Sequence, residues 1–418
     1  MPHAAIRALL AAIDAAAVAS IAQRLIAAPS PNPPGETGAV AQVAADILRA
    51  AIPGVDLALH DTGEGIVNLV ARVRGTGPGR RIVLNGHLDT YPVNPDLPWT
   101  VDPLAGTLRD GRLYGRGAAD MKGGIAASIA ALAALAEMRA HWPGEAVLTL
   151  AGDEETMGAR GTQWLIENVP HAAGDAAIIG DAGSPSVLRF GEKGFLWVHV
   201  AAGGTPSHGA HVHLGVNAIA RLRRALDALD ALADLPFDAP GDVTAAIAAA
   251  WPMSEPLAGA GEAGVLGRIT VNVGRIEGGT SMNLVPAAAA AWLDIRLPAG
   301  ADPAAMETAL AAALDPMDGV RWEVLRRVGP SVTPPGSEII RRTAAAAQEV
   351  LGFAPAVNMR VGGSDARLFR RFGIPTVVYG PTPFNMGGAD ENVLVAELGV
   401  VARVHALAAF DFLAGAAE

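Results

Sequence analysis

The sequence predicts an α/β fold in which a discontinuous larger domain, with a central and mostly parallel sheet, is interrupted by a smaller α+β domain. Short apolar runs indicate strands buried on both faces, and helical stretches separate them along the chain. Such runs occur at Arg81–Asn85, Glu145–Ala151 and Ala176–Ile179, with helices expected over 123–138 and 161–169. Strands that alternate with helices are typical of sheets with parallel strands.

The order of elements changes at about Arg189. From there the pattern predicts strand, helix, strand, strand, helix and strand, which is typical of a small separate domain. The alternation of the first part resumes after the proline-rich stretch that follows Val328. We therefore expect a larger domain of residues 1–187 and 329–418 and a smaller domain of residues 188–328. The elements of the smaller domain are expected at Phe195–Ala201, Gly215–Leu232, Arg268–Ile276, Ala288–Leu297, Pro303–Leu314 and Val320–Val328.

The composition narrows the classes of function. The 418 residues carry 31 Lys and Arg against 42 Asp and Glu, a net charge of −11, so nucleic acid is not expected as a partner. The chain contains no cysteine, which excludes disulfides, thiolate nucleophiles and cysteine metal sites. Histidine, aspartate and glutamate remain as the available metal ligands.

No segment is predicted to be a signal peptide or a membrane span. The first 25 residues lack a basic start, and Asp14 interrupts their apolar character, which is typical of an amphipathic helix. The longest apolar stretch, Gly123–Leu135, is shorter than the ~20 residues that cross a bilayer. We expect a cytoplasmic protein without a membrane partner.

Acidic and imidazole side chains stand at the ends of the predicted strands and before one helix. Each alone would be an ordinary cap or surface group. Several such groups at strand ends indicate a common site, because open α/β sheets bind ligands at the carboxyl ends of their strands. The groups are His87, Asp89, Asp120, Glu154, Glu155 and Asp181.

These residue types predict metal chemistry. Neutral imidazole together with carboxylates is a ligand set for zinc, manganese or cobalt. A histidine ligand needs its second nitrogen held, and Asp89, two residues after His87, is a suitable partner. Glu154 and Glu155 are adjacent and point apart, so one can bind the metal while the other acts as general base on a water.

Motifs along nearly the whole chain resemble the metallopeptidase family of acetylornithine deacetylase, succinyl-diaminopimelate desuccinylase, aminoacylase and glutamate carboxypeptidase. Their order makes the resemblance specific, since a single HxD motif would be a weak signal. The motifs are PSPNPPGETG (29–38), NGHLDTYPV (85–93), YGRGAADMKGG (114–124), GDEETMGARGT (152–162), GEKG (191–194), PSHGAHVHLGVNAI (206–219), NVGRIEGGTSMNLVP (272–286), LDIR (293–296) and GGSDAR (362–367).

The resemblance implies a centre of divalent metal (zinc, manganese or cobalt) that cleaves amide bonds. His87, Asp120 and Asp181 resemble the ligands of one metal. Asp120 resembles a bridge to a second metal held by Glu155, and Glu154 resembles the general base.

The resemblance also implies that the smaller domain is a lid that forms a homodimer. His208 resembles a histidine that reaches the active site of the neighbouring subunit and stabilises the oxyanion. Asn283 and Arg296 resemble groups that hold the substrate carboxylate, arginine by its planar fork. A cis peptide bond between Asp120 and Met121 is implied as well.

One position departs from the family pattern. The family's last ligand is a histidine four residues before a glutamate, and here Gly387 stands four residues before Glu391. The one histidine in the C-terminal part is His405, which lies in an apolar run and is expected in the core. Asn385 could add a weak oxygen ligand to the second metal site, but we expect it to be a turn residue. We therefore expect one firm metal site and a second site that is weak or empty.

The leading prediction is a hydrolase that cleaves the amide C–N bond of a small carboxylate-bearing substrate, such as an N-acyl amino acid or a dipeptide. A metal-activated water would attack, with Glu154 as general base. Two alternatives stay open. The altered metal site would suit a metal-dependent aminohydrolase that deaminates an aromatic amino-carboxylate. A non-catalytic ligand-binding relative is the other alternative, and the presence of Glu154 beside His87, Asp120 and Asp181 argues against it.

Overall fold

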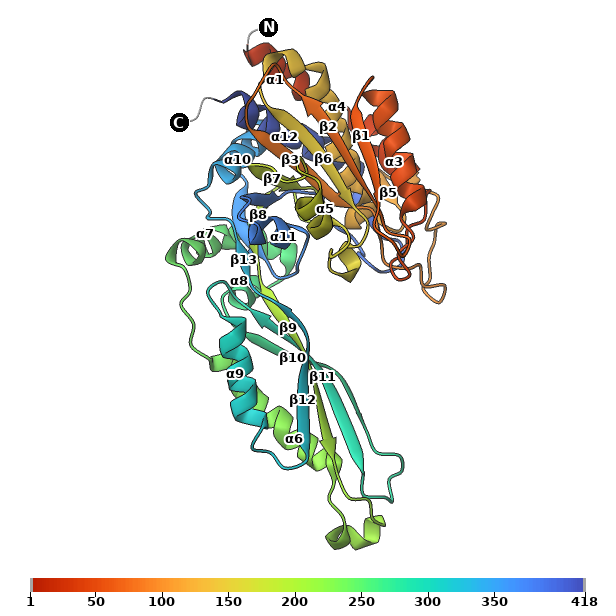
Figure 1. Cartoon of the computed structure of the whole chain (residues 1–418), viewed down its shortest axis with the longest axis vertical. Coiled ribbons are helices and arrows are strands. Elements are labelled where there is room, and N and C mark those ends of the chain that lie inside the picture. The colour runs from red at the N-terminus through yellow and green to blue at the C-terminus, as the bar shows by residue number, and fades with distance from the viewer. Residues whose placement is uncertain (1–2, 416–418) are drawn as a thin grey trace.

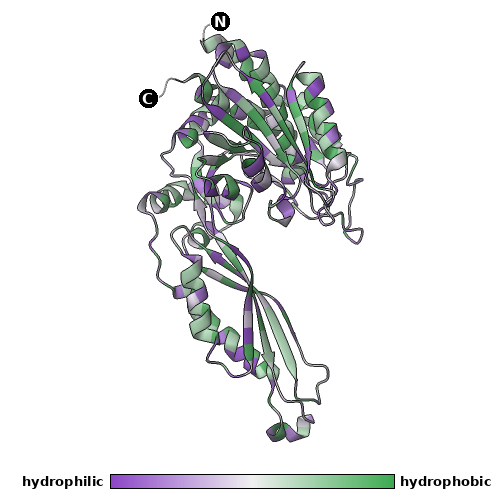
Figure 2. Cartoon of the chain, in the orientation of Figure 1, coloured by the Kyte–Doolittle hydropathy of each residue, from purple (hydrophilic) through white to green (hydrophobic). Residues whose placement is uncertain are grey.

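The computed structural model describes residues 3–415, which form a large α/β body and a long extension built on a second sheet (Figure 1). Residues 1–2 and 416–418, at the ends of the predicted larger domain, lie outside the described range. The strands inside the body are predominantly hydrophobic, as Figure 2 shows. The α/β class expected from the sequence is confirmed.

The body is organised around a nine-stranded sheet. In sheet order its strands are β1 (Asp56–Asp61), β2 (Val67–Arg74), β6 (Glu145–Ala151), β3 (Arg81–His87), β7 (Ala176–Ile179), β15 (Thr376–Val378), β8 (Val187–Glu192) and β13 (Ser331–Val332), with β14 (Ala356–Arg360) paired to β8. The middle strands β6, β3, β7 and β15 are parallel, and most pairings outside them are antiparallel. The sheet is mixed, so the expected mostly parallel order holds only for its centre. The β1–β2 hairpin and the reversed strand β8, which leads into the extension, account for the difference.

Helices cover both faces of this sheet. The helix α4 (Gly123–Glu137) is apolar all round because it contacts α12 (Val395–Ala414) and α2 (Ala15–Ile26) as well as the sheet. One face carries α1 (His3–Leu10), α2 (Ala15–Ile26), α3 (Gly38–Ala51), α4 (Gly123–Glu137), α10 (Glu338–Leu351) and α12 (Val395–Ala414), and the other carries α5 (Thr162–Asn168) and α11 (Ala366–Arg371).

One described helical stretch, Ala118–Glu137, is long and apolar enough to cross a bilayer by length and composition alone. Of its apolar window, 78% is buried inside the body. The stretch therefore serves as a core helix, as the sequence predicts for 123–135.

The extension contains a four-stranded antiparallel sheet in the order β10 (Thr270–Gly278), β11 (Ala288–Leu297), β9 (Gly194–Gly203) and β12 (Val320–Val328). The helices α6 (Ala218–Leu229) and α9 (Pro303–Leu314) pack on one face of this sheet and enclose a second core. These elements follow the strand–helix order predicted for the smaller domain. Short helical turns η4 (Gly209–Leu214) and η5 (Asp230–Asp234) connect them.

Two segments inside the predicted range 188–328 pack with the body. Strand β8 belongs to the large sheet, and the helices α7 (Gly241–Ala258) and α8 (Glu262–Leu266) contribute Val243, Ile247 and Leu266 to the core of the body. The side chain of Arg189 on β8 donates to Ser254 Oγ at 3.3 Å and to Glu262 Oε1 at 3.2 Å, which fixes both helices. The chain therefore passes between body and extension four times.

Small elements surround the carboxyl ends of the central strands. A three-stranded sheet contains β16 (Asn392–Leu394), β5 (Arg112–Tyr114) and β4 (Thr107–Arg109). The helical turns η1 (Ala118–Lys122), η2 (Arg139–His141) and η3 (Glu154–Thr156) complete the described secondary structure of the body. Of these, η1 and η3 carry groups that the sequence assigns to the site.

Candidate metal centre and catalytic site

Three side chains converge at the carboxyl ends of β3 and β7. One ligand atom each from His87, Asp120 and Asp181 lies within 4.8 Å of the other two. Strands β3 and β7 are parallel neighbours, so the residues that follow them meet at one edge of the sheet. Asp120 lies on η1, directly before α4, and α4 comes so close to the residue after β7 that a Cβ on Gly124 would lie 1.7 Å from the Gly180 carbonyl oxygen. The peptide bond between Asp120 and Met121 is cis, as expected.

The His87 ring is buried, and each of its nitrogens has a polar partner. Its Nδ1 lies 2.9 Å from the Asp89 backbone carbonyl oxygen, so Nδ1 donates and Nε2 faces the Asp120 carboxylate, also at 2.9 Å. Burial alone would lower the pKa of His87, but the Asp120 and Asp89 carboxylates outweigh it and raise this pKa well above its usual value. The same Nε2 is therefore placed to bind a cation when the proton leaves.

The Asp89 carboxylate supports the neighbouring turn as well as His87. It accepts hydrogen bonds from the backbone N–H groups of Glu154 and Glu155 at 3.2 and 3.0 Å, and from Asn32 Nδ2 at 2.8 Å. Its distance to His87 Nδ1 is 3.4 Å, so the backbone oxygen of Asp89 is the nearer partner of the ring. One buried residue thus fixes both the histidine and the glutamate pair.

The two glutamates on η3 have unlike surroundings. Arg367 Nη1 donates to Glu154 Oε1 at 2.8 Å. Burial raises the pKa of Glu154 by more than the Arg367 charge lowers it. Glu155 Oε1 is buried without a hydrogen-bond partner among the described residues, and burial with the nearby Asp120 charge raises the pKa of Glu155 to about 9.

These carboxylates fit a divalent cation. Burial and the charges of neighbouring carboxylates raise the pKa values of Asp181, Glu154 and Glu155, and Glu155 Oε1 is buried without a hydrogen-bond partner among the described residues. A bound cation would satisfy such oxygens and favour their charged forms. Within residues 3–415, His87, Asp120 and Asp181 are the one group of three whose ligand atoms are mutually close, and Glu155 stands outside it.

Two arginines from the returning C-terminal segment complete the site, and sequence reasoning did not assign them. Arg360 Nη1 donates to Asp181 Oδ2 at 2.8 Å, and Arg367 holds Glu154 as described above. The nearby Asp181, Glu192 and Asp120 charges outweigh the effect of burial and raise the pKa of Arg360. The GGSDAR motif contains Arg367, so the motif was a signal for its position, whereas no pattern marks Arg360.

The segment around Gly387 is docked onto the loop that carries Asp120. Buried Glu391 accepts hydrogen bonds from Arg116 Nη1 at 2.5 Å and from the backbone N–H groups of Ala119 and Asp120 at 3.0 and 3.3 Å. Arg116 Nη2 also donates to the Gly387 carbonyl oxygen at 2.9 Å. Glu391 therefore positions a candidate ligand through its backbone.

The position that a side chain on residue 387 would enter is next to a tyrosine ring. A Cβ added to Gly387 would lie 3.8 Å from Tyr91 Cδ2. The Tyr91 hydroxyl interacts with Glu155, and burial with the Glu155 and Asp120 charges raises the pKa of this hydroxyl. Asn385 has φ 53° and its carbonyl oxygen accepts from the Gly388 N–H, which makes it a turn residue as expected.

The residues predicted in the smaller domain are not part of the cluster around His87. His208 Nδ1 accepts from the Ala210 N–H at 3.1 Å, and the Gly209 N–H donates to the Asn283 carbonyl oxygen, so His208 and Asn283 lie together. Both lie beyond the far end of β9, a ten-residue strand that spans roughly 33 Å. Arg296 pairs with Asp294 at 2.9 Å near the other end of that strand, opposite Phe195.

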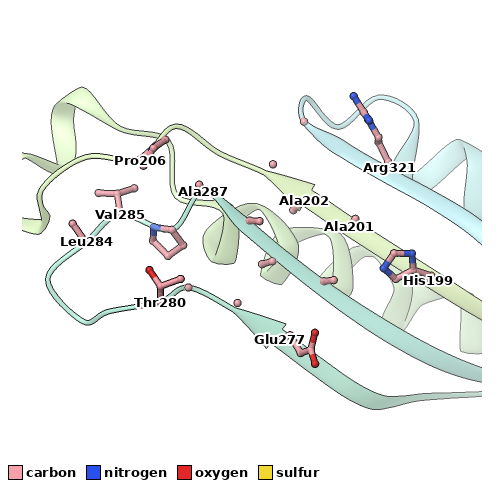
Figure 3. Close-up of a pocket in the computed structure, with 18 residues that line it drawn as sticks. His199, Ala201, Ala202, Pro206, Glu277, Thr280, Leu284, Val285, Ala287 and Arg321 are labelled. Atoms are coloured by element: carbon pink, nitrogen blue, oxygen red, sulfur yellow. The ribbon is translucent and has the colours of Figure 1, made fainter.

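The extension carries a cavity of its own. A hollow of about 750 Å³ lies over the Ala-rich part of β11, with His199, Glu277 and Arg321 at its rim (Figure 3). Its lining residues all belong to the extension, so this cavity is separate from the metal ligands. The histidine His405 is also separate: it is fully buried, with Nε2 2.8 Å from the Tyr379 carbonyl oxygen, and is a core residue as expected.

The chain is similar in sequence and in fold to known proteins. The chain is 32% identical over 414 residues to succinyl-diaminopimelate desuccinylase of Rhodospirillum centenum, an alignment that covers 95% of this chain and 97% of that protein. An M20 family metallo-carboxypeptidase from Sulfolobus solfataricus has the same fold, with a TM-score of 0.76 at 21% identity over 93% of this chain and 98% of that one. A dinuclear metal binding peptidase of the M20 family from Bacillus subtilis gives a TM-score of 0.64 at 14% identity, over 96% of this chain and 98% of that one.

The profile of peptidase family M20/M25/M40 matches residues 83–411, more than three quarters of the chain. The match spans His87, Asp120, Glu154, Glu155 and Asp181. The chain therefore belongs to peptidase family M20/M25/M40 and is a hydrolase of amide bonds.

Proposed function

We propose that this protein hydrolyses the amide bond of a small N-acyl amino acid or dipeptide, with a divalent ion held by His87, Asp120 and Asp181. The convergence of these three ligand atoms beside Glu154 carries the proposal. The relative named succinyl-diaminopimelate desuccinylase supports an N-acyl amino acid as the substrate class. Arg360, a buried cation in contact with Asp181, supports a substrate that bears a carboxylate.

The protein side chains divide the work of the reaction. A divalent ion in this site would supply a Lewis acid that acidifies a water and polarises the scissile carbonyl. Glu154 accepts the proton of the attacking water and delivers it to the departing nitrogen. Arg367 occupies Glu154 Oε1, so the proton is carried at Oε2. Asp89 holds the Glu154 backbone, which keeps the carboxylate in reach of the site.

We further propose that one ion of zinc, manganese or cobalt is sufficient for activity. On the Glu155 side of Asp120, Gly387 supplies no imidazole, and a Cβ at position 387 would be in van der Waals contact with the Tyr91 ring at 3.8 Å. Glu155 and Asp120 alone are too few ligands for a firm second site, since zinc takes four and manganese six. The Tyr91 hydroxyl is placed to donate to Glu155 in place of a second cation.

We propose that the extension, within the range 188–328, acts as a lid that forms a homodimer. His208 and Asn283 lie too far from the metal ligands of their own chain to act there, which supports a role at the site of a second chain. A mixture of His208→Ala and Glu154→Gln chains tests this. If His208 acts across subunits, mixed dimers contain one intact site, and about a quarter of wild-type activity returns. No recovery after subunit exchange would contradict a shared site.

The experiment that tests the central proposal is product analysis with manganese-loaded enzyme. N-succinyl and N-acetyl amino acids and dipeptides are supplied, and free amino acid, acyl fragment and ammonia are measured separately. We expect a free amine together with the carboxylate of the acyl group. Ammonia without an acyl fragment would instead support the aminohydrolase alternative.

The matched variants are Glu154→Gln and Glu167→Gln. Glu167 is exposed on α5, so its variant controls for the loss of one acidic group. Glu154→Gln should lower kcat by about 10²–10⁴-fold with metal content unchanged, because a general base contributes this much. Equal activities in the two variants would remove Glu154 from the mechanism.

A further inference from the structure

A second cavity, of about 770 Å³, lies where the extension joins the body. It is bounded by α11 and β13, which stand next to each other at this junction in Figure 1, and by the end of β12. No aspartate or glutamate is among its lining residues. Its charged residues are all arginines: Arg326, Arg327, Arg367, Arg370 and Arg371.

An irregularity in β12 directs one of these arginines to the outer face of the lid sheet. Val324 pairs with Val198 on the face that the helices cover, and regular alternation would place Arg326 on the same face. A bulge between Val324 and Arg326 reverses the alternation, so that Arg326 pairs with the outward Trp197 and stacks over its ring at 5.6 Å. Bulges of this kind re-aim side chains beside functional sites.

The wall formed by the body contains buried guanidinium groups. Arg370 donates to Ser331 Oγ and to the Thr376 carbonyl oxygen, both at 3.2 Å, and its Nε is buried without a partner among the described residues. Arg367 spans from the cavity to Glu154. These groups are held in place before any ligand arrives, which lowers the entropic cost of binding.

The positive charge of the cavity is only partly compensated. Glu307, Glu154 and Glu192 each pair with one lining arginine from outside the cavity. Within residues 3–415, neither Arg326 nor Arg371 has a carboxylate within ion-pair distance. Such a concentration of cations is unusual in a chain of net charge −11.

We propose that this arginine-lined cavity binds a small dianion, of the dicarboxylate or phosphate class. Guanidinium groups bind both types of anion through paired N–H donors. An anion in the cavity would also be attracted by the Arg367 guanidinium, which holds Glu154. Binding of the anion is therefore coupled to the candidate general base. The anion is either the distal end of the substrate or a free ion, and the chemistry of the cavity suits both.

The test is calorimetric titration of the whole metal-loaded protein with succinate and, separately, with inorganic phosphate at fixed chloride concentration. The variant is Arg326→Gln/Arg371→Gln, which keeps Arg367 and Arg370. The matched control is Arg223→Gln/Arg224→Gln, which removes the same charge from exposed positions on α6. We expect saturable binding of one anion per chain, weakened at least about tenfold in the variant and within about twofold in the control.

Absence of saturable binding to wild type, or equal weakening in the control, would overturn the proposal. Binding needs no catalysis, so this result is independent of the proposed hydrolytic activity. Kinetics then distinguish the two sources of the anion. If the cavity holds the substrate, the variant raises KM only for substrates with an additional carboxylate. If it holds a free ion, succinate changes kcat without competing with the substrate.

Discussion

The two sides of Asp120 carry the same kind of residue but offer a cation different surroundings. On one side, His87 and Asp181 stand at the ends of neighbouring parallel strands, with their ligand atoms close to Asp120. On the other side, Glu155 lies near the Asp120 carboxylate and the Tyr91 hydroxyl but belongs to no group of three mutually close ligand atoms among the described residues, and Gly387 contributes no side chain. A metal site is thus defined by how many donors converge, and an acidic residue alone does not make one.

The strongest way to test this contrast is to remove one donor from each side. His87→Ala should weaken binding of the first ion by about 10²-fold or more, because a full four-ligand site contributes 10–16 kcal/mol. Glu155→Gln should leave the affinity of that ion within about tenfold. Equilibrium dialysis with metal analysis measures both. Equal losses in the two variants would mean that Glu155 is a ligand of the same ion.

Glu391→Gln tests how the shared residue Asp120 is held. Loss of the charge leaves Arg116 without its buried partner and weakens the hydrogen bonds to the Ala119 and Asp120 backbone. Metal affinity should fall by about 10–100-fold, which is typical for a residue that supports a ligand. Glu397→Gln, on the neighbouring helix α12, is the matched control, and it should retain wild-type affinity. An unchanged affinity in Glu391→Gln would show that Asp120 needs no such support.

A third experiment attempts to make the two sides alike. Tyr91→Val/Gly387→His replaces the ring with an imidazole, and a second ion should bind at least about tenfold more tightly than in wild type. Gly387→His alone should gain less, because the Tyr91 ring remains beside position 387. Gly373→His controls for histidine at a similar backbone angle, since Gly373 has φ 76° against 75° for Gly387 and open space around it. Two ions bound tightly by the wild type would end the single-ion proposal.

The smallest expected effect is a shift in pH dependence. Burial raises the pKa of Glu154, and the Arg367 charge opposes that rise. Removing the charge in Arg367→Met should therefore raise this pKa further and move the acidic limb of the kcat profile to higher pH, by about one unit. Activity at pH 6 should fall more than activity at pH 8. A limb that stays in place or moves to lower pH would contradict this electrostatic role.

The apolar patterns of the sequence predicted those strands in which buried positions are continuous or alternate regularly. Strand β3 and the strands β11 and β12 have continuous or alternating apolar residues, and they form close to the expected positions. The ligands at the ends of β3 and β7 follow from the rule that parallel strands end at one edge. The positions of these ligands could be predicted because each ligand follows a strand in the sequence and the strands run in the same direction in the sheet.

Contacts between distant parts of the chain were not readable in this way. The packing of α7 and α8 on the body, and the contacts of Arg360 and Tyr91 with the site, depend on residues far apart in sequence. The bulge in β12 also left no mark in the apolar pattern, although it decides which face Arg326 takes. Hydrophobic periodicity describes one secondary-structure element at a time, so it cannot predict contacts between elements that are distant in sequence.

The four passages of the chain between body and extension have a mechanical consequence. An inserted domain that is joined to the rest of the protein by two chain segments can rotate about one hinge axis. Here α7 and α8 return to the body from the middle of the insertion and add two further attachments. The Lys193 ammonium also joins the first and third passages, since it donates to the Val265 and Arg268 carbonyl oxygens at 2.7 Å. The extension is therefore not free to rotate about one hinge axis, and a movement of the extension away from the body requires several short segments to bend together.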